Sequence, residues 1–263
     1  MDRELSRRYL HAMGVQVWRC REEDGVGEKQ VRASESLLLE GQAPPVEPAT
    51  LPQAGIESSP HGVSPPAGDD RVAQMDWERL SRAVTGCRAC ELCETRTQTV
   101  FGVGNLNADL MVIGEAPGAE EDRQGEPFVG RAGQLLNLML QAIGLRRDQV
   151  YIANILKCRP PGNRDPRPGE ALQCEPYLLR QIALVRPRAL LSVGRISAQN
   201  LLKTDTPIGR LRGRWRDFGP DAVPLMVTYH PAYLLRSPGQ KSKAWQDLLQ
   251  IARRLRTRAG ISG

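Results

Sequence analysis

Three of the chain's six cysteines stand within seven residues, in the stretch CRACELC at 87–93, and two more follow at Cys158 and Cys174. Thiolates at Cys-x-x-Cys spacing bind metal, and four of them can hold either a structural zinc ion or an iron–sulfur cluster. Zinc sites of this kind usually pair two short hooks, whereas this chain has one. The spacing leaves zinc and cluster open, with unligated buried cysteines as the alternative. Cys20 lies apart and is expected to be a free thiol.

Polar side chains also follow four short apolar runs, DLMVIG (109–114), VYIANIL (150–156), ALLSVG (189–194) and PLMVTYH (224–230). These runs predict strands buried on both faces. Ligands of open parallel sheets bind beyond the carboxyl ends of the strands. We therefore expect Glu115, Asn154 and His230 to meet at one edge. A carboxylate, an amide and an imidazole together are suited to catalysis.

The segments between these runs position the strands. RAGQLLNLMLQAIG, GEALQCEPYLLRQIALV and RISAQNLLK carry apolar residues at helical spacing, and KAWQDLLQIARRLR closes the pattern. Alternation of strands and helices predicts an α/β fold in which helices cover both faces of a parallel sheet.

Composition divides the 263 residues into three parts. Residues 41–75 are expected to be a disordered Pro-rich linker, because seven prolines and few bulky apolar residues in 41–70 cannot offset chain entropy. The linker separates an N-terminal segment, 1–40, from a domain at 76–263. Residues 1–75 hold 8 Lys/Arg against 12 Asp/Glu, and the remainder 28 against 18. A basic domain favours a polyanionic partner such as nucleic acid, with an ordinary solvated basic surface as the alternative.

No apolar run is long enough to span a membrane, and the N-terminus has no signal-peptide core. We therefore expect a cytoplasmic, nucleoid-associated monomer.

Nine motifs between about residues 77 and 256 resemble the family 4, iron–sulfur type, uracil-DNA glycosylases. They are CRAC, TRTQTVFGVGN, GEAPGAEED, GEPFVGRAGQLL, YIANILKCRPPGNRDP, the single Cys174, LSVGRISAQNLL, GRLRGRW and TYHPAYLLR. The resemblance implies a three-layer α/β/α sandwich around a four-stranded parallel sheet. It also implies a DNA repair enzyme that hydrolyses the bond between uracil and deoxyribose and leaves an abasic site.

The resemblance further implies a 4Fe–4S cluster bound by Cys87, Cys90, Cys158 and Cys174. Cys93 matches no family ligand and is expected to be a bystander or an alternative ligand. The cluster is expected to hold the loop before Cys158 to the helix that bears Cys174. Hydrolysis itself needs no electron transfer.

The roles of the strand-end residues follow from the same resemblance. Phe128 is expected to stack on the flipped uracil, and Asn154 to accept from uracil N3–H and donate to O4, a pattern that cytosine reverses. His230 is expected to donate to uracil O2 as charge develops, and Glu115 to orient or deprotonate water. The other expected pocket residues are Gly114 and Ala116, through their backbone groups, and Glu121, which could exclude the thymine methyl group.

The segment PAYLLRSPGQKSK, after His230, is expected to contact the duplex. An apolar side chain can enter the minor groove while cations bind phosphates. Leu234 or Leu235 is the predicted wedge, with core packing as the competing explanation. The predicted phosphate contacts are Arg236, Lys241 and Lys243, and Arg159, Arg164 and Arg167 are expected to contribute to the basic face.

Residues 6–21, SRRYLHAMGVQVWRCR, predict a short helix followed by an extended aromatic stretch. The pattern resembles the N-terminal peptide of the bacterial clamp-loader psi subunit, which implies docking to the replication machinery. Two other readings of the whole chain stay open. One is a non-catalytic iron–sulfur DNA-binding module whose function lies in this tether, and the other keeps the fold but binds zinc.

Overall fold

The computed structural model describes residues 7, 10, 11, 14 and 69–257. Most of the predicted N-terminal segment, 1–40, and of the predicted linker, 41–75, therefore lies outside the described residues. Helix α2 (Asp69–Ala73) begins inside the range predicted as linker and packs against α7 (Pro168–Val185). None of the helices in the described part is long and apolar enough to cross a membrane.

The four predicted runs form the parallel centre of one mixed sheet. Its strand order is β1-β3-β2-β4-β6-β5, and neighbouring strands among β3, β2, β4 and β6 are parallel. The strands are β1 (Val103–Gly104), β2 (Leu110–Gly114), β3 (Tyr151–Asn154), β4 (Ala189–Val193), β5 (Trp215–Phe218) and β6 (Val223–Thr228).

The sheet has six strands, so the expected four-stranded sheet was wrong in number. The two additional strands, β1 and β5, lie at the edges and pair antiparallel with their neighbours. β1 has only two residues, and β5, with sequence WRDF, is only partly buried. Edge strands need no continuous apolar run, which is why the sequence pattern did not indicate them.

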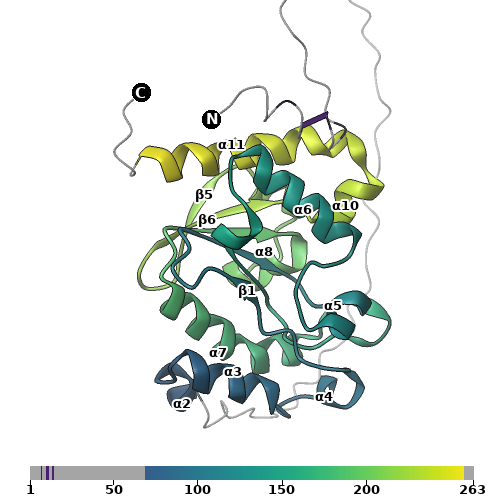
Figure 1. The fold of residues 1–263 in the computed structure, drawn as a ribbon, viewed down its shortest axis with the longest axis vertical. Helices are drawn as coiled ribbons and strands as arrows, with labels where there is room; N and C mark the ends of the chain where they lie inside the picture. The colour runs from purple at the N-terminus through teal and green to yellow at the C-terminus, as the bar shows by residue number, and fades with distance from the viewer. Residues whose placement is uncertain (1–6, 8–9, 12–13, 15–68, 258–263) are drawn as a thin grey trace, which may run out of the picture. The chain divides into compact units, whose positions relative to one another are not determined.

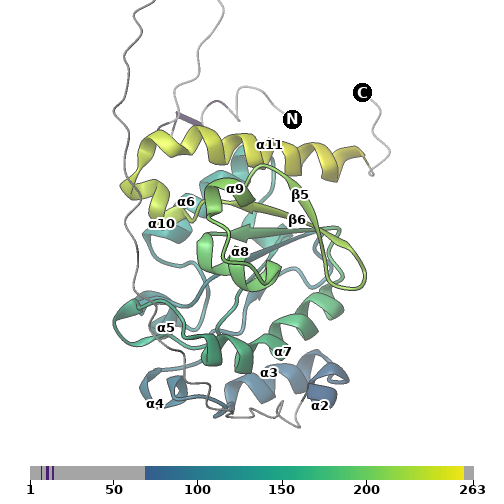
Figure 2. The same cartoon turned by 180° about the vertical axis from the view of Figure 1, so that it is seen from behind.

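Helices cover both faces of the sheet, as expected for a three-layer α/β/α sandwich. Figure 1 shows α6, α10 and α11 on one side and α7, α3 and α2 on the other. Figure 2, from behind, shows α8 and α9, which contact β4 and β6 respectively. The remaining helical elements are α3 (Trp77–Thr85), α4 (Leu92–Thr95), α5 (Ala119–Gln124), α6 (Arg131–Ala142), α8 (Arg195–Leu202), α9 (Ile208–Leu211), α10 (Pro231–Arg236) and α11 (Lys241–Thr257), with short 3₁₀ turns at Arg147–Gln149, Pro161–Asn163 and Pro238–Gln240.

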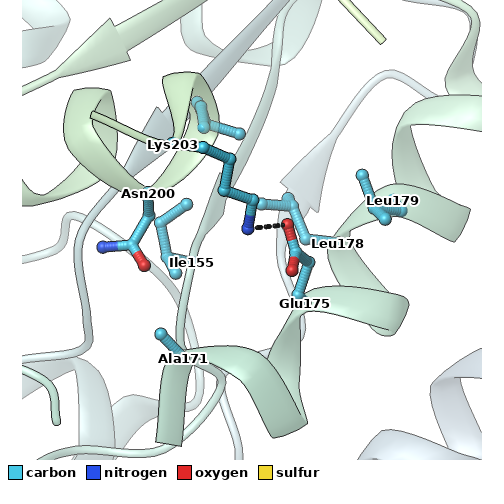
Figure 3. A pocket seen from close by; sticks show the side chains of 8 residues that line it. Ile155, Ala171, Glu175, Leu178, Leu179, Asn200 and Lys203 are labelled. Atoms are coloured by element: carbon cyan, nitrogen blue, oxygen red, sulfur yellow. Dashed lines mark hydrogen bonds and ion pairs between the residues drawn. The ribbon is translucent and has the colours of Figure 1, made fainter. Parts of the chain in front are cut away.

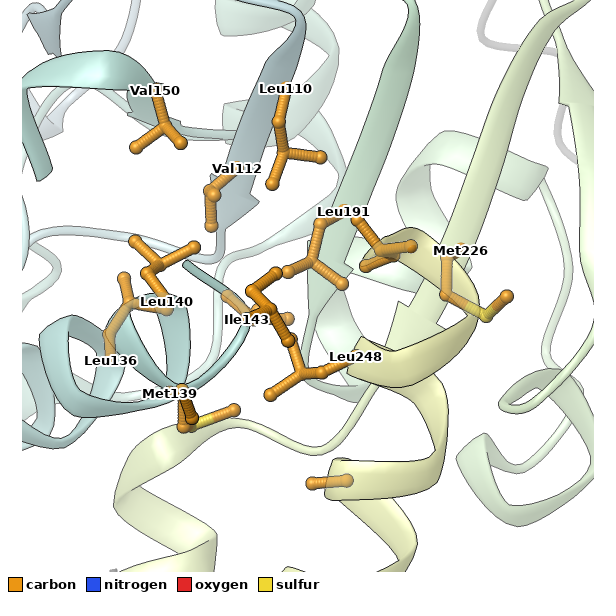
Figure 4. Packing of buried hydrophobic residues seen from close by; sticks show 14 of the residues in the cluster. Leu110, Val112, Leu136, Met139, Leu140, Ile143, Val150, Leu191, Met226 and Leu248 are labelled. Carbon is orange, nitrogen blue, oxygen red and sulfur yellow. The ribbon is translucent and has the colours of Figure 1, made fainter. Parts of the chain in front are cut away.

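Alternate residues of β2 enter two separate cores. Leu110 and Val112 of β2 pack with Leu136 and Leu140 of α6 and with Leu248 of α11 (Figure 4). Met111 and Ile113, which point to the opposite face, belong to the cluster that includes Leu178 and Ile182 of α7. Burial on both faces explains why the strands read as continuous apolar runs. Leu10, from the N-terminal segment, is also buried in the first cluster.

Candidate active site

The strand register brings the predicted polar residues to one edge of the sheet. Gly114 of β2 pairs with Asn154 of β3, so Glu115 follows directly beside Asn154. Val193 of β4 pairs with Thr228 of β6, two residues before His230. Parallel strands end at a common edge, and the sequence therefore fixes which side chains meet there.

One cavity at this edge, which we call the strand-end cavity, brings most of the predicted site residues together. It contains about 1100 Å³ of empty space, including the solvent at its mouth, which is ample for a pyrimidine. The predicted residues that line it are Glu115, Ala116, Glu121, Phe128, Asn154, Arg164, His230 and Arg236.

The Asn154 side chain ends in an acceptor that has no partner. Asn154 is 2% exposed, and its Oδ1 atom is buried and accepts no hydrogen bond from any described residue. Buried polar atoms are nearly always hydrogen-bonded, so an orphaned acceptor at a cavity wall requires an explanation. Gly114 lies next to it and does not line the cavity. The geometry is that of an amide ready to receive an N–H donor from a ligand.

His230 presents a ring N–H to the cavity. Its Nδ1 atom accepts a hydrogen bond from the backbone N–H of Ala232 at 3.1 Å, at the start of α10. Burial, and to a lesser degree the nearby Arg236 cation, lowers the pKa of His230 to about 4. The imidazole is therefore neutral near pH 7, and with Nδ1 accepting, its proton resides on Nε2. The ring is stacked against Phe128, with centroids 5.6 Å apart.

Phe128 is held in an unusual backbone conformation. Its φ of 55° lies in the left-handed region, which is rare for a bulky residue. Arg147 donates to the carbonyl oxygen of Phe128 at 3.3 Å and to that of Pro127 at 2.5 Å. A Cβ atom on Gly133 would lie 1.8 Å from the Phe128 oxygen, so only glycine allows this approach. Such strain persists when the surroundings determine it, and it is common at ligand sites.

The carboxylate of Glu121 is fully engaged with the backbone. One oxygen accepts from the N–H of Gly118 at 3.1 Å, and the other from Val129 at 3.0 Å and Gly130 at 3.1 Å. These bonds join both ends of the loop that carries Phe128. Glu121 lies at the cavity wall, as predicted, and its carboxylate also holds the loop that carries Phe128. The sequence did not indicate this second role.

Glu115 is half-buried and its acidity is altered by its surroundings. Burial, and to a lesser degree the Asp165 carboxylate, raise the pKa of Glu115 to about 7 against the opposing effect of Arg195. Asp165 and Arg195 form an ion pair at 2.6 Å. A carboxyl group with a pKa near neutrality can exchange a proton under physiological conditions, as a general base must.

The two candidate wedge residues differ completely in exposure. Leu234 is 1% exposed and belongs to the first core cluster, so it packs inside the protein and is not available to DNA. Leu235, the next residue of α10, is 37% exposed. Which leucine is exposed depends on which side of the six-residue helix α10 faces the core. Apolar periodicity over so short a segment does not predict that side.

The predicted basic residues fall into two groups. Arg236, Lys241 and Lys243 are exposed or half-buried, and none of them forms an ion pair within the described chain. Of these three cations, only Arg236 lines the strand-end cavity. Arg164, by contrast, donates hydrogen bonds from both of its terminal nitrogens to the two carboxylate oxygens of the buried Glu170, at 2.9 and 2.5 Å. The guanidinium of Arg164 is therefore already committed.

Sequence reasoning missed several wall residues. Most are small or carry no ionisable group and so gave no chemical signal, although Tyr233 stands in the singled-out segment PAYLLR and is 37% exposed. Pro117 and Gly118 belong to the motif GEAPGAEED that follows the first strand, and the missed residues are Ala132, Pro160, Asn163, Ala232 and Tyr233.

All five cysteines of the domain line a second cavity, the thiol cavity. Cys87 and Cys90 lie before α4, Cys93 lies within it, Cys158 follows β3 and Cys174 lies in α7. Arg96 donates to the Cys158 sulfur at 2.9 Å, and the backbone N–H of Lys157 to the Cys174 sulfur at 3.2 Å. N–H donors to sulfur are usual around thiolate-bound metal centres. In the described residues, no three His, Cys, Asp or Glu side chains are arranged to hold a single metal ion.

Burial opposes thiolate formation in the absence of a metal. It raises the pKa of Cys90 and Cys158, and it raises that of Cys174 to about 12. The same burial lowers the pKa of Lys157 to about 8, against the opposing effect of Cys174 and Cys158. The four predicted ligands thus share one cavity together with two cations, a donor set that suits an anionic thiolate cluster.

A smaller hollow between α7 and α8 lacks these features (Figure 3). Its walls include Ile155, Leu178 and Leu201, and an ion pair between Lys203 and Glu175 at 2.5 Å lies within it. Both charges are already paired, and the amide nitrogen of Asn200, the other polar side chain at its wall, donates to the backbone oxygen of Ile196.

Comparison with known proteins identifies the family of this chain. The family model of the uracil DNA glycosylase superfamily matches residues 101–249, so the chain belongs to this superfamily. The type-4 uracil-DNA glycosylase of Archaeoglobus fulgidus is 45% identical over 182 residues, which cover 65% of this chain and 89% of that protein. The type-4 enzyme of Thermotoga maritima is 42% identical over 163 residues, covering 61% and 83%. A type-5 uracil-DNA glycosylase of Pyrobaculum aerophilum is only 30% identical, over 60% of this chain and 75% of that protein. The chain belongs to the type-4 uracil-DNA glycosylase family.

Proposed function

We propose that this protein is a DNA repair glycosylase that extrudes uracil from DNA and hydrolyses its N-glycosidic bond. The observation that carries the proposal is the buried, unpartnered Oδ1 atom of Asn154 at the wall of the strand-end cavity. Uracil N3–H is a donor that would satisfy it, and the amide nitrogen would donate to uracil O4. Cytosine offers an acceptor at N3, which would leave Asn154 Oδ1 unpaired, so it is rejected.

The stacking surface for the base is Phe128, which lies opposite Asn154 across Gly114. A Cβ atom on Gly114 would lie 2.3 Å from Asn154 Oδ1 and 2.6 Å from Phe128 Cζ. Without a side chain, Gly114 lets both the Phe128 ring and the Asn154 amide lie close to the backbone of β2, so that the base can stack on the ring while its edge meets the amide. In this arrangement Ala116 contributes backbone groups, and Glu121 keeps the Phe128 loop closed.

The chemical step is hydrolysis. As the bond between C1′ and N1 breaks, its electron pair passes to the uracil ring, where negative charge develops on O2. The Nε2–H of the neutral His230 donates to that oxygen, an interaction typically worth about 3–4 kcal/mol in the transition state. Glu115, as a carboxylate, orients the water that adds to C1′, accepts its proton and stabilises the positive sugar.

Duplex DNA would be held by the surface around α10. Leu235 fills the space that the extruded nucleotide leaves, while Arg236, Lys241 and Lys243 contact phosphates. The exposure of Leu235 and the absence of ion pairs to these cations among the described residues support this assignment.

We assign the thiol cavity to a 4Fe–4S cluster held by Cys87, Cys90, Cys158 and Cys174. The cluster would supply no chemistry to hydrolysis. It would crosslink the segment before α4, the loop after β3 and helix α7. Iron and sulfide analysis, together with absorption near 400 nm, distinguishes it from zinc.

The activity is tested with a labelled oligonucleotide that contains one uracil, treated with alkali after incubation. The proposal predicts release of free uracil, detected by mass spectrometry, and an alkali-labile break at its position. Oligonucleotides with cytosine or thymine at that position should stay intact. An unbroken uracil strand after incubation with cluster-loaded protein would refute the enzyme and favour a non-catalytic DNA-binding module.

A separate proposal concerns residues 6–21 and rests on sequence alone. This segment would tether the enzyme, a nucleoid-associated monomer in the cytoplasm, to a clamp-loader protein. Capture of clamp-loader protein by the full chain should be lost in a Trp18→Ala variant, and equal capture by both would end the idea.

A further inference from the structure

Lys157 is a buried cation between the two cavities. It is 1% exposed, and its Nζ atom donates to the backbone oxygen of Asn154 at 2.9 Å and to Gln181 Oε1 at 2.6 Å. Both acceptors are neutral, and no ion pair joins Lys157 to a carboxylate of the described chain. An ammonium group removed from water without a counter-charge costs several kcal/mol, so its burial needs an anion nearby.

The thiol cavity can supply that anion. Lys157 lines it directly, and the backbone N–H of the same residue donates to the Cys174 sulfur. A second cation, Arg96, lines the cavity and bonds the Cys158 sulfur and the Cys87 carbonyl oxygen. An oxidised 4Fe–4S core with four thiolates carries two negative charges. Two cations facing the cavity balance them.

Lys157 also contacts Asn154, a wall residue of the strand-end cavity, through the backbone of that residue. The backbone oxygen that it holds belongs to Asn154, whose side chain carries the unpartnered acceptor. Gln181, its other partner, lies in α7 two turns after Cys174, and its amide nitrogen donates to the Phe101 carbonyl oxygen and the Tyr151 hydroxyl as well. The ammonium group thus connects the Cys174 helix with the end of β3.

We propose that Lys157 is a positioning residue that acts as the internal counter-ion of the cluster and fixes Asn154 for uracil recognition. The inference rests on the proposed function. It deepens that function by making uracil recognition depend on the charge in the thiol cavity, although the cluster takes no part in hydrolysis.

The test compares cluster-loaded Lys157→Met with Lys203→Met. The control removes an exposed lysine that is ion-paired to the same helix α7 through Glu175. Without DNA, the reduction potential of the cluster should become more negative in Lys157→Met and stay unchanged in Lys203→Met, because a buried positive charge favours the added electron. An unchanged potential in Lys157→Met would overturn the counter-ion role.

Free uracil serves as the probe of Asn154. The concentration of free uracil that inhibits DNA binding or uracil excision by half should rise about tenfold in Lys157→Met. This is the effect expected for a displaced hydrogen-bonding group. The affinity of the variant for abasic DNA should stay unchanged. Unweakened uracil inhibition beside a shifted potential would overturn the positioning role. The potential is measured without substrate, so failure of the wild type to excise uracil would sink the proposed function and leave the counter-ion result intact.

A second variant covers failure of Lys157→Met to assemble. Gln181→Met removes one acceptor of the ammonium group but keeps the charge and its bond to Asn154. If Gln181→Met binds the cluster with the wild-type reduction potential while Lys157→Met binds none, the result supports the need for the positive charge of Lys157. Loss of the cluster in both variants would indicate that the network serves packing alone and would overturn the proposal.

Discussion

Asn154 and Gly114 lie side by side across the β2–β3 pair, and a Cβ atom on Gly114 would come within 2.3 Å of Asn154 Oδ1. The same atom would lie 2.6 Å from the Phe128 ring. The Asn154 amide and the Phe128 ring therefore converge over a residue without a side chain. Only glycine leaves both in place.

A methyl group at this point should disable recognition. Gly114→Ala is expected to lower kcat/KM for uracil excision about 100-fold, because a displacement of about 1 Å at a reacting site has that effect. Gly209→Ala, in α9 with open space around its Cβ position, is the control and should keep wild-type activity. Single-turnover excision measures both, and wild-type activity of Gly114→Ala would contradict the need for close packing of Asn154 and Phe128 against Gly114.

The raised pKa of Glu115 predicts a pH dependence. Because the carboxylate is the active form, kcat/KM should fall about tenfold per pH unit below a midpoint near pH 7. Glu115→Gln should lower the rate and remove this inflection. Glu120→Gln, at a neighbouring exposed carboxylate paired with Arg123, should leave the profile as in wild type. Persistence of the inflection in Glu115→Gln would assign it to another group.

His230 should act as a neutral donor. Its replacement in His230→Ala is expected to lower kcat about 100- to 1000-fold with little change in KM, because the hydrogen bond strengthens only as charge develops. With a folded pKa of about 4, nitrogen NMR at pH 6 should show one protonated ring nitrogen, Nε2. A doubly protonated ring at that pH would contradict this assignment.

The depressed pKa of His230 also affects stability. Between pH 6.5 and pH 4 the unfolded chain binds a proton at His230 that the folded chain does not. The contribution of His230 to the free energy of unfolding should therefore fall as pH falls through this range.

Leu235 should matter for duplex DNA alone. Leu235→Ala is expected to slow excision from a U·G duplex several-fold to tenfold more than excision from single-stranded DNA, which has no stack to keep open. Leu172→Ala, which truncates another exposed leucine, in α7, should slow neither. An equal loss on both substrates would indicate that Leu235 supports the fold of α10.

The sequence was informative wherever burial imposes a pattern. The four central strands, and hence the meeting of Glu115, Asn154 and His230, follow from apolar runs that end in polar residues. It was uninformative at the partly exposed edge strands β1 and β5. The burial of Leu234 depends on which side of the short helix α10 faces the core, and the backbone contacts of Glu121 depend on how the loop closes. Neither feature produces a periodic pattern of apolar residues in the sequence.

The most direct measurement is a crystal structure of the cluster-loaded protein with free uracil. The account predicts that the base stacks on Phe128, with N3 about 3 Å from Asn154 Oδ1 and O2 at a similar distance from His230 Nε2, both ordinary hydrogen-bond lengths. Uracil bound elsewhere, or bound in this cavity with Asn154 Oδ1 still unpartnered, would contradict it.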